Sequence, residues 1–427
     1  MVLQLQSGDM VVFFLELAVM LSVALLCGQL AKWLHFPAII GEIIGGIILG
    51  PTMFGQIIPG TENWLFPTSG AVFLGRDALV QICLLFFIFY AGLEMDLHLV
   101  KKNRSGIFWT SLFSLSIPFI LGFAIVILFP GLWGNYIRPH ADVFALFIGV
   151  ALSISALPVI ARVLMDLDLM KTDLGMLIMG SATVNDLIGW SIFAVILSNF
   201  SSAGIISLNP FMTVVLILIL LLFMLTVGRA VGQWVLQLVR SNTSWRGAFL
   251  GITMVYVLLA GAFSEMIGVQ AVFGAFLVGI ALSQNVGSRS ESADLLQQFI
   301  MNFAAPLYFV SIGLQTNFLT SFDPVLVAVV LLVAFAGKTI GAFIGARFGG
   351  LPSGKAVIIG FAMSTGGAME IVLATVARSS GIIDDRIFVA LVIMAIVTSL
   401  ISGPVIGRLG KVGQNKPASP PSGQIGE

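Results

Sequence analysis

Apolar stretches of about twenty residues follow one another along almost the whole chain, with few polar residues between them. A helix needs roughly 20 mostly apolar residues to cross the hydrocarbon core of a bilayer. Only 9% of the 427 residues are charged, whereas a soluble globular chain carries about a quarter. Lipid must therefore surround most of the folded chain, and we expect an all-α polytopic integral membrane protein.

The apolar stretches divide the chain into about thirteen predicted spans. These lie near 11–31, 38–50, 78–93, 106–128, 143–164, 172–198, 210–236, 247–263, 268–284, 295–314, 324–346, 355–378 and 387–407. Residues 1–409 would form one transmembrane domain. Residues 410–427 are rich in Pro, Ser and Gly, which predicts a short disordered tail.

The basic residues are distributed unevenly over the predicted loops. With the N-terminus placed outside, fifteen Lys and Arg residues lie on the inner side and four lie on the outer side, namely Arg76, Arg138, Arg378 and Arg386. Basic residues are enriched in cytoplasmic loops. We therefore expect an outside N-terminus and a cytoplasmic C-terminus, in a bacterial inner membrane.

The fifth and twelfth predicted spans carry small, hydroxyl and helix-breaking residues near their middle, at 151–158 and 361–370. Pro158 lacks an N–H, and its ring clashes with the carbonyl of Ile154. If one span is a linker, the remaining spans form two halves of opposite topology, with the interrupted spans in equivalent positions. Interrupted helices paired in this way indicate a transporter site at the membrane midplane. We see no residue-level repeat, so the inverted repeat rests on the pattern of spans.

Asp186 lies near the middle of the sixth predicted span. A charged Asp costs roughly 2.5–3.5 kcal/mol at that depth on insertion scales. A carboxylate that faces a wet cavity can hold either a proton or a small cation, and competition between the two would itself produce exchange. The alternative is an Asp that merely hydrogen-bonds a neighbouring helix. Asn185 and Thr183 are candidate ligands beside it, or polar contacts between helices.

Lys338 is the only Lys or Arg deep inside a predicted span. It can pair with Asp186 when no cation is bound, release its own proton, or form a fixed structural ion pair. Glu370, in the twelfth span, is a candidate second proton site, salt-bridge partner or helix-end charge.

Oxygen atoms at the two interruptions are hard ligands suited to alkali cations. The candidates are the carbonyl of Ile154, freed by Pro158, and the hydroxyls of Ser153, Ser155, Ser364 and Thr365. A simple proline kink and close helix packing are the alternatives.

Five motifs in order resemble the monovalent cation/proton antiporters of the Kef and plant cation/proton-exchanger type, which are Na⁺/H⁺ exchanger-like. They lie at 37–51, 91–96, 151–190, 306–317 and 360–370, and the resemblance extends to about Gly407. It identifies Asp186 as the ion-binding aspartate, Lys338 as the intramembrane lysine and Glu370 as the glutamate near the helix crossing.

The resemblance implies a thirteen-helix, inverted-repeat fold in which two discontinuous helices cross. It also implies a homodimer with a dimer-forming part and a moving ion-carrying core, the core including about 78–198 and 295–407. Many electrogenic members have two adjacent aspartates, whereas Asn185 stands first here. One-for-one exchange is therefore plausible, although Lys338 can still carry a second proton.

The resulting hypothesis is a secondary antiporter that exchanges Na⁺ or K⁺ for H⁺ by alternating access. A gated K⁺ efflux channel on the same fold, and a membrane receptor or assembly protein without flux, are the alternatives. Zero net charge gives no reason to expect a nucleic-acid partner. The residues also indicate no enzyme chemistry, and we expect no cofactor beyond the transported ions.

Overall fold

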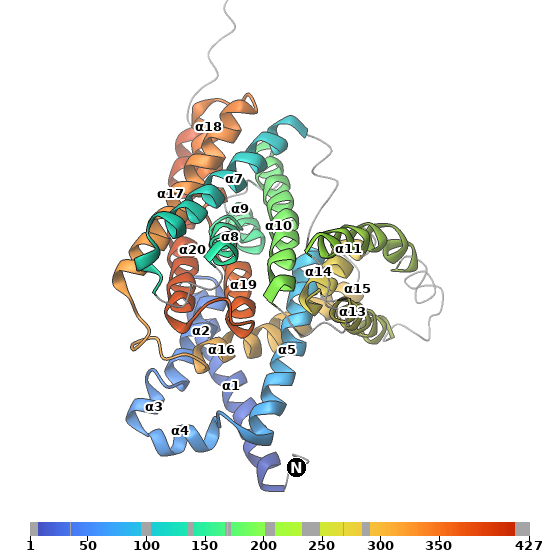
Figure 1. The fold of residues 1–427 in the computed structure, drawn as a ribbon, viewed down its shortest axis with the longest axis vertical. Coiled ribbons are helices and arrows are strands. Elements are labelled where there is room, and N and C mark those ends of the chain that lie inside the picture. Colours follow the sequence, from blue (N-terminus) through green and yellow to red (C-terminus); the bar gives the residue numbers. More distant parts are fainter. Residues whose placement is uncertain are drawn as a thin grey trace, which may run out of the picture.

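The computed structural model describes residues 7–34, 36–94, 104–134, 141–166, 169, 172–200, 210–232, 248–267, 269–283 and 291–414. Every regular element among them is a helix, as the sequence predicts. The helices form two bundles (Figure 1).

The crossed-helix bundle contains the two interrupted spans and the helices packed on them. Its members are α7 (Arg104–Leu128), α8 (Ala141–Ala151), α9 (Leu157–Asp166), α10 (Asp173–Phe200), α17 (Pro324–Phe348), α18 (Ser353–Met363), α19 (Ala368–Ser379) and α20 (Asp385–Gln414). A 3₁₀ turn, η1 (Pro130–Leu132), follows α7. The break between α8 and α9 and the break between α18 and α19 lie at the predicted positions.

The flanking bundle lies below and beside the first in Figure 1. Its members are α1 (Ser7–Trp33), α2 (Ala38–Leu49), α5 (Gly70–Leu93), α11 (Pro210–Phe223), α13 (Ala248–Met266), α14 (Ala271–Ser283), α15 (Glu291–Phe299) and α16 (Ala305–Leu314). The π turns η3 (Met224–Gly228) and η5 (Ile300–Ala304) extend α11 and join α15 to α16. The short helices α3 (Phe54–Ile57) and α4 (Pro59–Leu65) connect α2 to α5.

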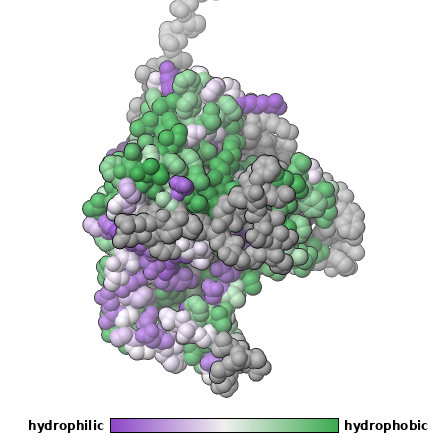
Figure 2. Space-filling model, viewed as in Figure 1, coloured by the Kyte–Doolittle hydropathy of each residue, from purple (hydrophilic) through white to green (hydrophobic). Residues whose placement is uncertain are grey.

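Helix lengths support a membrane protein but do not confirm thirteen spans. Each predicted span overlaps a helix. Among the described residues, eight helices are long and apolar enough to cross a bilayer, and the bent pair α18–α19 makes up to nine. Four further apolar helices have only 10–17 described residues. Figure 2 shows apolar side chains gathered over the upper part of one face, as expected for a surface that meets lipid.

Two details differ from the expected domain limits. The predicted core of 78–198 and 295–407 includes α5 and α16, yet both helices pack in the flanking bundle. Helix α20 continues to Gln414, beyond the expected start of the tail at 410, and residues 415–427 lie outside the described part of the chain.

Glycines explain why α5 and α16 belong to the flanking bundle. A Cβ atom on Gly313 of α16 would overlap the backbone of α2 at Gly46 and Ile47. Gly92 of α5 and Gly279 of α14 approach each other's backbones in the same way. In lipid, small residues allow helices to approach closely and gain van der Waals contact. These pairs therefore fix which helices pack together.

We predict that Gly313→Ala separates α16 from α2 and destabilises the protein, because overpacking costs about 1–3 kcal/mol. The melting temperature of the purified protein in detergent should fall by several degrees. Gly251→Ala is the control, since a Cβ there meets no atom within 4 Å. Equal melting temperatures for the two variants would contradict the role given to this contact.

Candidate functional site

The two broken helices satisfy each other's backbone where they meet. Ser155 Oγ donates to the carbonyl of Met363 at 2.7 Å, and the N–H of Ala156 donates to the carbonyl of Thr365 at 3.0 Å. Irregular backbone within a membrane is tolerated only where it is buried in protein or lines a cavity. These bonds show how the two interruptions are held together.

Lys338 of α17 connects both breaks. Its Nζ donates to the carbonyl of Ile154 in the first break and forms an ion pair with Glu370 Oε1 at the start of α19. Glu370 Oε2 also accepts the N–H of Gly367 at 3.2 Å, so it caps the N-terminus of α19. Lys338 and Glu370 are only 1% and 2% exposed. Among the partners that the sequence left open for Lys338, the structure pairs it with Glu370.

Asp186 is fully buried on α10, and neither carboxylate oxygen has a hydrogen-bond partner among the described residues. Lys338 and Glu370 both lie close enough to interact with it electrostatically. Gly189, three residues further along, accommodates the side chain of Ile154, so α10 lies directly against the first break. Burying a bare carboxylate without donors is very unfavourable. The negative charge of Asp186 must therefore be compensated, by a proton or by a cation.

The remaining predicted side chains differ in whether their polar atoms are already bonded. The hydroxyls of Ser153, Thr183 and Ser364 donate to carbonyls of their own segments at 2.6, 2.9 and 2.8 Å. By contrast, Thr365 Oγ1 and Asn185 Oδ1 are buried and have no partner among the described residues. Pro158 is the second residue of α9, where it begins the helix after the break. Whether these residues bind an ion stays a prediction.

Sequence reasoning missed two serines on α7. Ser114 Oγ accepts a hydrogen bond from Asn185 Nδ2 at 2.8 Å, and Ser111 Oγ donates to the carbonyl of Ser181 at 3.3 Å. Their spacing places both serines on one face of α7. The spacing of the two serines was the signal that the sequence offered for a polar face on α7. It does not show which helix packs against that face.

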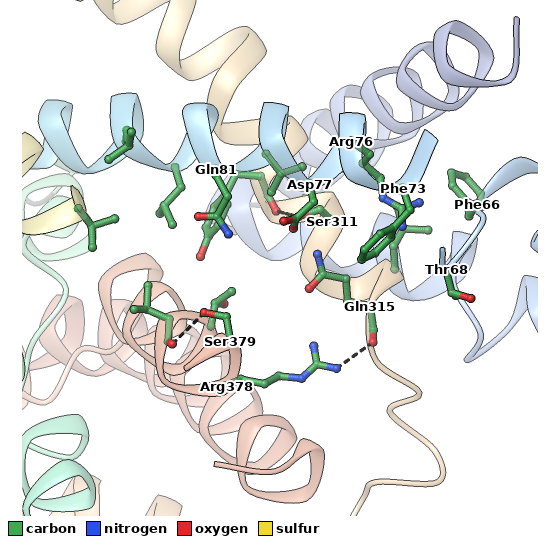
Figure 3. Close-up of a pocket in the computed structure, with 18 of the residues that line it drawn as sticks. Phe66, Thr68, Phe73, Arg76, Asp77, Gln81, Ser311, Gln315, Arg378 and Ser379 are labelled. Atoms are coloured by element: carbon green, nitrogen blue, oxygen red, sulfur yellow. Dashed lines mark hydrogen bonds between the residues drawn. The ribbon is translucent and has the colours of Figure 1, made fainter. Parts of the chain in front are cut away.

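A cavity of about 960 Å³ lies between the bundles on the side of Arg378 (Figure 3). It is lined by α5, α14, α16, α19 and the segment between α2 and α5. Arg378 of α19 donates to the carbonyl of Gln315, just after α16, at 3.0 Å and pairs with Asp385 at 2.6 Å. The bond to Gln315 thus joins the two bundles, and Asp186 is not among the described residues that line the cavity.

The charged groups of the cavity carry both signs. Its lining includes Glu62, Asp77 and Glu265 together with Arg76 and Arg378. Glu62 lies on α4, outside the spanning helices, where burial raises the pKa of its carboxyl and the nearby Arg76 guanidinium opposes that rise. Arg76 itself is paired with Glu16 of α1. The carboxylates of this cavity can therefore attract cations.

We predict that Lys338→Met destabilises the protein strongly, because it leaves Glu370 buried without its partner. Breaking a buried pair by removing one member costs about 3–5 kcal/mol. The double variant Lys338→Met/Glu370→Gln should recover part of that loss. Thermal unfolding of the single and double variants measures this coupling, and additive losses would show that the two groups do not stabilise each other.

The fold is that of a sodium/proton antiporter. It is similar to the sodium proton antiporter MjNhaP1 from Methanocaldococcus jannaschii, with a TM-score of 0.68 over 96% of this chain and 100% of that chain, at 16% identity. The family described as sodium/hydrogen exchanger, transmembrane, matches residues 20–412. The chain belongs to this family.

Two relatives illustrate the range of the family. The chain is 32% identical over 411 residues to the Na⁺/H⁺ antiporter NhaS4 of Synechocystis, covering 95% of this chain and 98% of that protein. It is 29% identical over 414 residues to the K⁺/H⁺ antiporter 1 of Saccharomyces cerevisiae, covering 93% of this chain but 46% of the yeast protein.

Proposed function

We propose that the protein is a secondary antiporter that exchanges a monovalent cation, Na⁺ or K⁺, for H⁺, with Asp186 as the shared site. The observation that carries this proposal is a fully buried carboxylate with two unpartnered oxygens beside the meeting point of two broken helices. One proton or one cation neutralises it, and both cannot occupy it together. The relatives named as Na⁺/H⁺ and K⁺/H⁺ antiporters support the same reaction.

The cation would be held by hard oxygen atoms around Asp186. Asn185 Oδ1 and Thr365 Oγ1 are the first candidates, because both are buried and unpartnered. Ser153, Ser155, Thr183 and Ser364 retain lone pairs after donating their protons, so they are secondary ligands. The donor set suits both Na⁺ and K⁺.

Transport would proceed by alternating access, in which the crossed-helix bundle shifts against the flanking bundle. The cavity between the bundles then forms the outer entrance, and the Arg378–Gln315 hydrogen bond must break as the bundles move. In this proposal the N-terminus lies outside and the C-terminus in the cytoplasm of a bacterial inner membrane. Helix α1 exposes an apolar surface and would form part of a homodimer contact.

The occluded position of Asp186 is the closed state that the proposed carrier cycle requires. A channel needs a continuous wet path at the moment of conduction, whereas a carrier passes through states in which its site is closed on both sides. Asp186 is 0% exposed, and the described residues that line the cavity do not include it.

We predict that Asp186→Asn abolishes exchange, because an amide can take neither the proton nor the charge of a bound cation. The assay is the collapse of an imposed pH gradient in proteoliposomes on addition of Na⁺, K⁺ or Li⁺. Asp142→Asn is the matched control, since Asp142 is an exposed aspartate at the start of α8. Unaltered exchange in Asp186→Asn would remove the proposed function.

We also predict one-for-one, electroneutral exchange. Glu370 already compensates Lys338 in this structure, so Asp186 is left as the single group that changes its ligand. Imposing a membrane voltage with a gradient of the permeant anion thiocyanate on liposomes assayed for Na⁺/H⁺ exchange should leave the rate unchanged. A rate that follows the voltage would show that a second proton moves.

A further inference from the structure

A directional chain of hydrogen bonds links α7 to α10 next to Asp186. Ser114 Oγ donates to the carbonyl of Ser111 at 3.3 Å and accepts from Asn185 Nδ2 at 2.8 Å. Ser114 is 1% exposed and Asn185 is 0% exposed, so water cannot replace either bond from outside. The orientation of the Asn185 amide therefore depends on this one hydroxyl.

The hydrogen bonds run in one direction in the structure. A hydroxyl carries a single proton. With the Ser114 proton directed to the carbonyl of Ser111, the lone pairs of Oγ face Asn185, and the amide presents its NH₂ group to them. The other end of the amide, Oδ1, is left without a partner in the described part of the chain.

This orientation has a chemical consequence for the neighbouring carboxylate. An amide oxygen can ligate an alkali cation, whereas an NH₂ group repels one. From this geometry we propose that Ser114 is a positioning residue for the cation, because its hydroxyl holds the Asn185 amide with Oδ1 unpartnered and able to act as a ligand. The proposal rests on the proposed antiport function.

The test compares Ser114→Ala with wild type in proteoliposomes, measuring the half-saturating concentration of Na⁺ and K⁺ and the maximal rate. A net hydrogen bond is worth about 0.5–1.5 kcal/mol, which corresponds to roughly a two- to tenfold change. We expect the half-saturating cation concentration to rise by about that factor while the maximal rate stays near wild type. Ser114→Thr keeps the hydroxyl and should restore the wild-type value.

Two further variants separate positioning from helix packing. Ser111→Ala removes a hydroxyl from the same face of α7 that bonds to a backbone carbonyl of α10 and not to the amide. It should leave the half-saturating concentration unchanged. In an Asn185→Ala background, Ser114→Ala should cause no further rise, because the amide that it orients is already absent.

The outcomes are distinct from those that test the main proposal. An unchanged half-saturating concentration in Ser114→Ala, an equal rise in Ser111→Ala, or an additive rise with Asn185→Ala would each overturn the positioning role. If Ser114→Ala does not fold, Ser114→Cys replaces it in the test, because its thiol is a weak acceptor of similar size. The half-saturating cation concentration of Ser114→Cys should then rise above wild type, by less than the roughly two- to tenfold factor expected for complete loss of the acceptor. Exchange that survives in Asp186→Asn would instead refute the antiport site itself.

Discussion

The ion pair between Lys338 and Glu370 is the interaction on which the rest of the site depends. Lys338 also holds the carbonyl of Ile154, while Glu370 caps α19 through Gly367, so one buried pair stabilises both breaks. Two charges in a membrane interior are costly when they are separate and tolerable when they are paired. The pair therefore permits non-helical backbone in the buried interior of the crossed-helix bundle.

The same arrangement leaves Asp186 as the uncompensated charge. Its oxygens have no partner in the described residues, and the Lys338 ammonium is already engaged by Glu370. Burying the Asp186 carboxylate costs little free energy only when it carries a proton or binds a cation. In the proposed antiport cycle, the coupling of the two fluxes would follow from this cost, because the empty carboxylate would resist movement of the crossed-helix bundle.

The features that depend on neighbouring residues in the chain could be predicted from the sequence. The apolar stretches, the break before Pro158 and the mid-span Asp186 each follow from residues close together in the chain. The partner of Lys338 did not follow, since it depends on how α17 is rotated against α19. The same limit applies to Ser114, because the sequence does not show which of the serines of α7 faces α10. The placement of α5 and α16 depends on which glycines lie at close helix contacts, and a single sequence does not show which glycines contact each other.

The most direct test of the central claim is proton release on cation binding. The purified protein is titrated with Na⁺ or K⁺ in weakly buffered detergent solution, and the pH change is recorded at a pH where the site is protonated. If one carboxylate holds either ligand, wild type should release about one proton per protomer at saturation, and Asp186→Asn should release none. Saturable cation binding without proton release, or equal release from Asp186→Asn, would contradict the shared site.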